Sequence, residues 1–220
     1  MVKKMDKRFI FIYRILPFTY IGMVRSAFGE LLKIKSNLDM LDLGCGDGSA
    51  TKNLGLPKNF KIIGVEIFKP YLPLAKEKGI YTKLLNKDVR KITASKKTDI
   101  VLAAHILEHF TKEEGRKFLK QVENLARKKI IIIVPIEDNP QEMYDKNQYQ
   151  EHKSSWKINE MKERGYEIKA HGLKLLWGNN NVVQKYKIFS YFLFIISDLF
   201  YPLLSIRPEL GTYMICVKDK

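Results

Sequence analysis

Short apolar runs and longer stretches of helical spacing alternate along most of the chain. The apolar runs are continuous, and several are rich in Ile and Val, as β-strands buried on both faces are. Between them, residues 111–129 carry Phe118, Leu119, Val122 and Leu125 at steps of three and four, which predicts an amphipathic helix. Expected strands lie at residues 38–44, 60–68, 82–85, 99–105, 129–136, 166–170 and 212–218.

This order of elements predicts an α/β fold. Polar stretches with helical spacing also occupy residues 70–79 and 154–164, so helices separate most of the strands. Continuous apolar strands that alternate with helices indicate a parallel sheet covered on both faces. Right-handed crossover connections then fix most of the topology.

A glycine loop follows the first expected strand. Residues 41–51 read LDLGCGDGSAT, with Gly44, Gly46 and Gly48 at alternate positions. Glycines between a strand and a helix let backbone N–H groups approach a nucleotide closely. The dinucleotide fingerprint G-x-G-x-x-G fails because Ser49 occupies its third glycine position, and no Lys-Ser/Thr pair completes a P-loop.

Four motifs in order resemble class I S-adenosylmethionine-dependent methyltransferases. LDLGCGDG resembles the first motif of that family, and Glu66 follows Gly48 by 18 residues, where the family has an acidic residue. KDVRKI at 87–92 resembles the next motif. DIVLAAHILEHF at 99–110 resembles the fourth-strand motif of the small-molecule, type 11-like branch. The resemblance covers about residues 38–136 and is weaker beyond them.

The resemblance implies a Rossmann-like, seven-stranded, mostly parallel sheet with an antiparallel last strand and apolar cap segments. It implies S-adenosylmethionine as the cofactor and no metal. In the family, the acidic residue and the glycine loop hold the methionine part, and the acidic residue at the second strand binds the ribose diol through its two oxygens. The cofactor-binding residues expected here are Asp42, Gly44, Cys45, Gly46, Glu66, Ile67, Asp88, Val89, Ala104 and His105.

Histidines supply the candidate groups for the acceptor side. His105 and His152 are the candidate general bases, with packing against the cofactor as an equal alternative for His105. His109, His152 and Trp156 are the expected acceptor-site residues, although His109 more often organises the loop in this family. His171 lacks such context and is expected to be an ordinary surface or strand residue.

Missing motifs narrow the acceptor. The fourth strand is followed by AAHILEH instead of the Asn/Asp-Pro-Pro-aromatic motif of base amino-methyltransferases, and Cys45 and Cys216 lie away from the position of a cytosine-methylating nucleophile. We therefore expect a small-molecule or lipid-linked acceptor that is methylated at oxygen or nitrogen. The alternatives are methylation of RNA ribose and a non-catalytic scaffold that only binds the cofactor.

The charge leaves the partner open. Lys and Arg number 39 against 24 Asp and Glu, for a net charge of +15. Such a surface attracts the phosphates of nucleic acid or of anionic lipids, but a solvated lysine-rich surface is an equal explanation. Two isolated cysteines indicate a reducing compartment, so we expect a cytoplasmic protein.

Two apolar segments interrupt the pattern, at residues 8–23 and 188–206. Neither is expected to span a membrane, since the second is only 19 residues long and contains Asp198 and Pro202. We expect residues 1–37 to form an apolar arm and helix, and 38–220 to form the methyltransferase domain with an apolar insertion at about 172–211. The basic residues that flank the two apolar segments suggest that these segments dock on an anionic membrane, which would make the protein peripheral at the inner membrane face. The alternative is that they form a dry lid on the domain or a dimer contact. The oligomeric state stays open.

Overall fold

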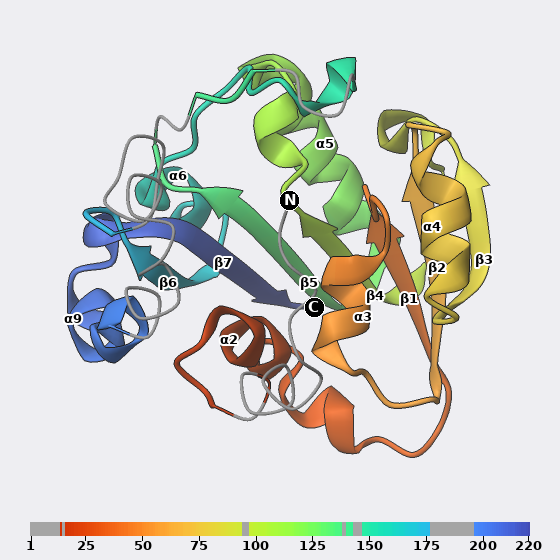
Figure 1. Ribbon diagram of the computed structural model, residues 1–220, viewed down its shortest axis with the longest axis horizontal. Coiled ribbons are helices and arrows are strands. Elements are labelled where there is room, and N and C mark those ends of the chain that lie inside the picture. Colours follow the sequence, from red (N-terminus) through yellow and green to blue (C-terminus); the bar gives the residue numbers. More distant parts are fainter. Residues whose placement is uncertain (1–13, 15, 94–96, 138–139, 143–146, 177–195) are drawn as a thin grey trace.

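The computed structural model describes residues 14, 16–93, 97–137, 140–142, 147–176 and 196–220 (Figure 1). Each expected strand is present there, with its ends shifted by no more than a few residues. The elements in chain order are α2 (Tyr20–Ser26), η1 (Gly29–Lys33), β1 (Leu38–Leu43), α3 (Ser49–Leu54), β2 (Phe60–Glu66), α4 (Tyr71–Glu77), β3 (Tyr81–Asn86), η2 (Val89–Lys91), β4 (Thr98–Ala104), η3 (Leu107–His109), α5 (Lys112–Leu125), β5 (Ala126–Pro135), η4 (Gln148–Gln150), α6 (Ile158–Lys162), β6 (Glu167–Leu173), α9 (Tyr201–Ile206), η6 (Pro208–Leu210) and β7 (Gly211–Asp219).

The strands of the described chain form one seven-stranded sheet in the order β3-β2-β1-β4-β5-β7-β6. The pairs from β3 to β5 are all parallel, whereas β7 runs antiparallel to its neighbours β5 and β6. The predicted Rossmann-like fold with an antiparallel last strand is therefore confirmed. Because β1 to β4 are parallel, their carboxyl ends meet at one edge, where open α/β sheets bind ligands.

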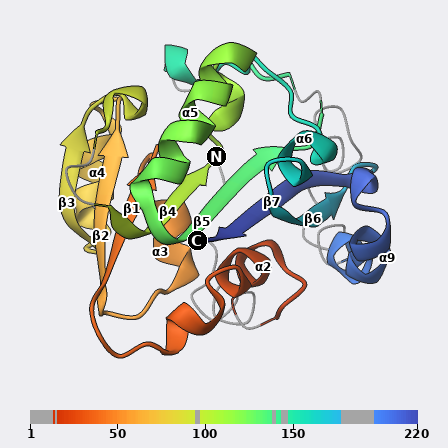
Figure 2. The ribbon, with the colours of Figure 1, turned by 180° about the vertical axis from the view of Figure 1, so that it is seen from behind.

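Each face of the sheet has its own apolar core. In β1, Leu41 and Leu43 face the layer of α5 and α6, while Leu38 and Met40 face the layer of α2 and α3. Figures 1 and 2 show these two layers from opposite sides. The buried faces explain the continuous apolar strands of the sequence, since neither side of a central strand meets water.

Helix α5 begins where predicted but ends at Leu125, because residues 126–129 of the predicted helix belong to β5. Its sequence contains both an amphipathic face and a start signal. Thr111 and Glu114 form a reciprocal capping box at its first turn. The four apolar residues named above are all buried. Gly115 also faces inward, and a Cβ there would lie 2.5 Å from Trp156 Cζ2. The helix thus packs directly on the Trp156 ring.

The helix expected at 154–164 is shorter than predicted, because α6 begins only at Ile158. The preceding residues are extended and are tied to other elements through their backbone. The N–H groups of Lys153 and Ser154 donate to the Glu108 carbonyl at 2.8 and 3.2 Å, and Trp156 forms an isolated bridge with Ile136. These tertiary bonds replace the helical ones.

The two apolar segments of the sequence are described only in part. Residues 1–13 and 15 of the N-terminal arm, and 177–195 of the insertion, lie outside the described residues. Helix α2 packs into the second core through Ile21, Met23 and Val24. Asp198 is buried and lies 2.9 Å from His171 Nε2 in β6. Among the described helices, none has the length and apolar character needed to cross a membrane.

Candidate active site

The glycine loop turns sharply between β1 and α3. All three glycines have positive φ, at +72° for Gly44, +55° for Gly46 and +77° for Gly48, a region that other residues rarely adopt. A Cβ on Gly44 would lie 2.4 Å from Ile106 Cδ1, so this position has no room for a side chain. A Cβ on Gly46 would meet no atom of the described chain within 4 Å. The Gly46 backbone is therefore open to a ligand.

Glu66 lies at the end of β2 and is 7% exposed. One carboxylate oxygen accepts from the Gly46 N–H at 2.9 Å and the other from the Phe68 N–H at 2.7 Å. Each oxygen keeps a second lone pair. The backbone thus fixes this carboxylate beside the open glycine, with capacity to accept from a pair of hydroxyl groups.

Asp42 supports the loop from behind. It is 2% exposed, and its Oδ2 accepts from Thr51 Oγ1 at 2.7 Å and from Tyr81 OH at 2.8 Å. Burial raises the pKa of Asp42 to about 6; the charge of Glu66 adds to this, while the two hydrogen bonds oppose it. Burial and the nearby Asp42 also raise the pKa of Tyr81, so its hydroxyl stays a donor.

A cavity opens at the carboxyl ends of β1, β2 and β4. Its volume is about 180 Å³, and about 820 Å³ when the space open to solvent is included. The expected residues Gly44, Glu66, Ile67, Asp88, Val89, His105 and His109 line it. The sequence analysis missed the other lining residues, which are Arg90, Ile106, Phe110, Glu114, Asn147, Tyr149, Gln150 and Lys153.

Several expected cofactor residues lie outside the cavity lining. Asp42 contacts α3 and β3, as described above, and Gly46 instead holds Glu66 through its N–H. Cys45 is buried behind the loop, where burial raises the pKa of its thiol, and Ala104 packs against the second core. Asp42, Cys45 and Ala104 thus lie behind the cavity wall, whereas Gly46 adjoins the cavity through its bond to Glu66.

Trp156 corrects a prediction about the acceptor side. Its side chain is 1% exposed and belongs to the first core, so it does not face the cavity. Its indole N–H donates to Ser154 Oγ at 3.0 Å, and Lys112 Nζ lies 3.8 Å from the ring centroid. The bridge to Ile136 turns this ring under α5, which the sequence pattern did not indicate.

His105 does line the cavity and has a strained backbone, with φ of +52°. Its Nε2 lies 2.8 Å from Tyr20 OH, and its Nδ1 lies 3.4 Å from Glu108 Oε1. Burial, with lesser contributions from Tyr213 and Glu108, raises the pKa of Tyr20, so this hydroxyl keeps its proton and donates to Nε2. The ring proton is thereby assigned to Nδ1, on the Glu108 side.

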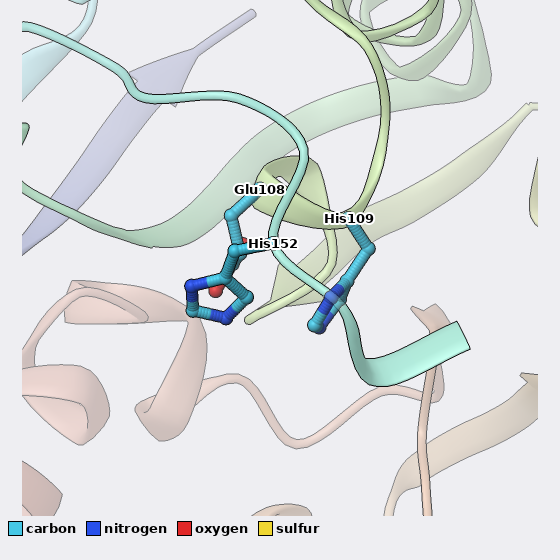
Figure 3. A group of neighbouring side chains, drawn as sticks. All are labelled: Glu108, His109 and His152. Atoms are coloured by element: carbon cyan, nitrogen blue, oxygen red, sulfur yellow. The ribbon is translucent and has the colours of Figure 1, made fainter. Parts of the chain in front are cut away.

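The side chains of Glu108, His109 and His152 gather at one place (Figure 3). The rings of His109 and His152 lie 5.0 Å apart between centroids, in an edge-to-face arrangement. Burial would raise the pKa of Glu108, but His105 and His109 hold it below its ordinary value, so the carboxylate is charged. His152 lies next to the cavity lining through its contact with His109.

The negative charge of Asp88 is balanced by the neighbouring Arg90. Arg90 Nη2 lies 2.6 Å and Arg90 Nε 3.0 Å from its carboxylate oxygens. Burial would raise the pKa of Asp88, but the hydrogen bonds and charge of Arg90 lower it overall. Arg90 also lies 5.4 Å from the Phe110 ring centroid and pairs with Glu114. Its place two residues after Asp88 is the sequence signal that would have identified it.

The far wall comes from residues 147–153, which no motif marked. Asn147 Oδ1 accepts from the Tyr149 N–H at 3.0 Å and starts the short helix η4. Tyr149 is 40% exposed at the cavity mouth. His171, expected to be a surface or strand residue, lies in β6, where it is buried and its Nε2 lies 2.9 Å from Asp198 Oδ1.

Comparisons with known proteins agree with this geometry. Residues 40–129 match the family model described as a methyltransferase domain. That span runs from β1 into β5 and contains the glycine loop, Glu66 and His105. No curated protein sequence matches the chain.

Solved structures share the fold at low identity. Magnesium protoporphyrin IX methyltransferase from Synechocystis PCC 6803, with bound SAM, is 16% identical with a TM-score of 0.55, covering 91% of this chain and 79% of its own. The 1,6-didemethyltoxoflavin-N1-methyltransferase of Burkholderia thailandensis, with its acceptor and S-adenosylhomocysteine, is 17% identical with a TM-score of 0.55, covering 91% and 77%. The plantazolicin methyltransferase BpumL, in complex with SAH, is 15% identical with a TM-score of 0.54, covering 99% and 91%.

The family match over residues 40–129, the strand order and the glycine loop all agree with a methyltransferase domain of class I fold. The resemblance to the class I S-adenosylmethionine-dependent methyltransferases is thus confirmed for residues 40–129.

Proposed function

We propose that the chain transfers a methyl group from S-adenosylmethionine to a small-molecule acceptor, at oxygen or nitrogen. The observation that carries this proposal is the Glu66 carboxylate, fixed by two backbone N–H groups beside the open Gly46 at the edge of the cavity. The acceptors named for two similar structures, a magnesium porphyrin and a toxoflavin precursor, are small molecules and support the same class.

The residues present fit the cofactor. When bound, S-adenosylmethionine supplies a methyl group activated on a sulfonium sulfur. Glu66 accepts hydrogen bonds from the ribose hydroxyls, and the backbone at Gly44 and Gly46 allows the close approach that the methionine part needs. Asp88, Val89 and the neighbouring Ile67 enclose the adenine. Asp42 acts through the loop, since its carboxylate already binds Thr51 and Tyr81.

The acceptor occupies the space between His105, His109 and the 147–153 wall. Placing a nucleophile in line with an activated methyl group supplies much of the rate in such a site. His105 and His152 are the candidate bases. Because Tyr20 donates to His105 Nε2, a proton moves through this ring only if the Tyr20 bond is released.

Calorimetric titration with S-adenosylhomocysteine tests the cofactor assignment. Glu66→Ala is expected to weaken binding by about 100-fold or more, because the diol loses its acceptor and the glycine loop loses its tether. Glu77→Ala, an exposed carboxylate on α4, serves as the matched control and should bind like the unmodified chain. Tight binding of NADH or ATP with no binding of S-adenosylhomocysteine would contradict the proposal.

Turnover separates the enzyme from its alternatives. Formation of S-adenosylhomocysteine in the presence of a cell extract freed of macromolecules supports a small-molecule acceptor. Cofactor binding without any turnover points to a scaffold. Turnover that requires RNA, with binding that falls steeply as salt rises, points to ribose methylation, which the net charge of +15 would serve.

We also propose that the acceptor is lipid-linked and reached at an anionic membrane surface. The end of the insertion exposes apolar side chains on and beside α9: Leu199 by 65%, Phe200 by 40%, Leu203 by 39% and Ile206 by 76%. Co-sedimentation with anionic vesicles is expected for the unmodified chain and should be lost in Leu199→Glu/Ile206→Glu. Absence of binding in low salt, or equal binding by the double variant, rejects this extension.

A further inference from the structure

Three side chains beside the cavity together form a set of metal-binding donors. Glu108 and His109 come from η3, and His152 comes from the segment after η4 (Figure 3). Each offers one donor atom, and these atoms lie within 4.8 Å of one another. Two imidazoles and one carboxylate suit divalent transition metals and leave coordination positions open for other ligands.

Glu108 has the environment of a metal ligand. Its side chain is 2% exposed, and neither carboxylate oxygen has a hydrogen-bond partner among the described residues. A buried carboxylate without such partners is costly, so an approaching cation gains strongly by compensating it. His105 Nδ1 stands 3.4 Å from Glu108 Oε1, beyond the usual length of a hydrogen bond.

The two histidines are held in position by the surrounding backbone. His109 Nδ1 lies 3.0 Å from the Glu151 carbonyl oxygen, which can only accept, so Nδ1 carries the proton and Nε2 keeps its lone pair. A second hydrogen bond of this kind commonly orients metal-binding histidines. His152 is placed by its own N–H, which donates to the Gln141 carbonyl at 3.1 Å, and by the neighbouring bonds to the Glu108 carbonyl.

We propose that Glu108, His109 and His152 bind one divalent transition-metal ion of the Zn²⁺ or Fe²⁺ type at the acceptor side of the cavity. Donor atoms around such an ion stand about 3.3 Å apart, so the side chains need to close by no more than roughly 1.5 Å. Nitrogen donors outnumber oxygen donors, which favours these ions over Mg²⁺. His152 is then a ligand, a role that differs from the general base expected from the sequence.

The ion gives the acceptor a specific chemistry, and this part rests on the proposed function. An acceptor hydroxyl that binds the metal becomes more acidic and loses its proton to water. Its oxygen then forms the bond to the methyl carbon, while the electrons of the broken carbon–sulfur bond stay on sulfur. The inference therefore favours a hydroxyl-bearing acceptor and methylation at oxygen.

Titration of the chelator-treated chain with Co²⁺ tests the site through the visible absorption of the bound ion. We expect saturation at about one ion per chain, displacement by Zn²⁺ and little competition from Mg²⁺. Addition of acetohydroxamate, an oxygen chelator, should shift the Co²⁺ bands if coordination positions are open. His109→Ala and His152→Ala are each expected to weaken binding by more than ~100-fold, since even losses outside the ligand set cost 10- to 100-fold.

Glu151→Gln is the matched control, because its side chain is exposed and only its backbone carbonyl contacts His109. Thermal melting and S-adenosylhomocysteine affinity are measured for every variant, so a folding defect is separated from a lost ligand. Unsaturable Co²⁺ binding, or binding by both histidine variants as tight as that of the unmodified chain, overturns the metal site. If the chain binds S-adenosylhomocysteine but no metal, the metal site is wrong and the proposed methyl transfer stands. If the chain binds metal but no S-adenosylhomocysteine, the proposed function is wrong and the metal site stands.

Discussion

The two walls of the cavity are built in different ways. On the proposed cofactor side, Gly44, Glu66 and Asp88 lie at or just beyond the carboxyl ends of β1, β2 and β3, and each is placed by its strand. On the acceptor side, residues 147–153 are placed by scattered backbone bonds, such as those to the carbonyls of Glu108 and Gln141. The first wall follows from the regular register of parallel strands, and the second follows from tertiary contacts.

This difference shows how a site can combine a shared cofactor with a particular acceptor. Strand ends hold their geometry when a loop sequence changes, because the sheet positions them. A wall made of loop bonds changes shape with a few substitutions. We therefore expect the cofactor side to be insensitive to changes in the acceptor wall, and the predictions below test this independence.

Trp156→Ala should produce the largest loss of stability. Removing a fully buried indole from between Lys112 and Gly115 is expected to lower the free energy of unfolding by about 3–5 kcal/mol. Urea denaturation measures this loss, and Trp156→Phe serves as a control that keeps most of the ring. At temperatures where the Ala variant is folded, S-adenosylhomocysteine affinity should stay unchanged while turnover falls. A loss of S-adenosylhomocysteine affinity as large as the loss of turnover would show that the two walls of the cavity depend on each other.

The sequence predicted the first wall because its cues are local. Three glycines at alternate positions require a turn, and Glu66 ends an apolar run of the length of a strand. The glycine conformations and the position of Glu66 follow from those cues. Asp42 shows their limit, since its acidic type and position gave no sign that Thr51 and Tyr81 would occupy its carboxylate.

The second wall could not be predicted in the same way. The family resemblance, in which a histidine and an aromatic at this place face the acceptor, predicts Trp156 there. Its orientation instead depends on pairing with Ile136, 20 residues earlier. Tyr20 contacts His105 across 85 residues of sequence. No periodicity encodes such contacts, because they depend on how separate elements pack.

Asp42→Asn should change the pH dependence of stability. The folded-state pKa of about 6 exceeds the ordinary value of 3.8, so the folded chain binds more protons between these values. Asp42 therefore contributes to the free energy of unfolding, and this contribution is fully present below pH 3.8. It is lost as the pH rises through 6, by roughly 3 kcal/mol in total. A neutral Asn keeps an oxygen for Thr51 and Tyr81, so the variant should be more stable than the unmodified chain at pH 7.

Melting temperatures of both proteins from pH 4 to 7 measure this difference, because other carboxylates affect the two curves equally. The curves should separate as the pH rises. Since Asp42 lies outside the cavity lining, cofactor affinity should stay within a few-fold of its original value. Parallel melting curves would mean that Asp42 is ionised in the folded chain, and a large loss of affinity would give it the direct role implied by the family resemblance.

Gly46→Ala and Gly79→Ala form a matched pair with the smallest expected effect. The two glycines have similar φ values, +55° and +67°, and a Cβ at either meets no described atom within 4 Å. Each substitution should therefore destabilise the fold by about 1 kcal/mol through backbone strain alone. Only Gly46 lies beside Glu66 at the cavity, so only Gly46→Ala should also weaken S-adenosylhomocysteine binding, by roughly tenfold in calorimetry. Equal affinities in the two variants would mean that the open space at Gly46 does not receive the cofactor. The cofactor would then be bound by Glu66 and Asp88 without the glycine loop.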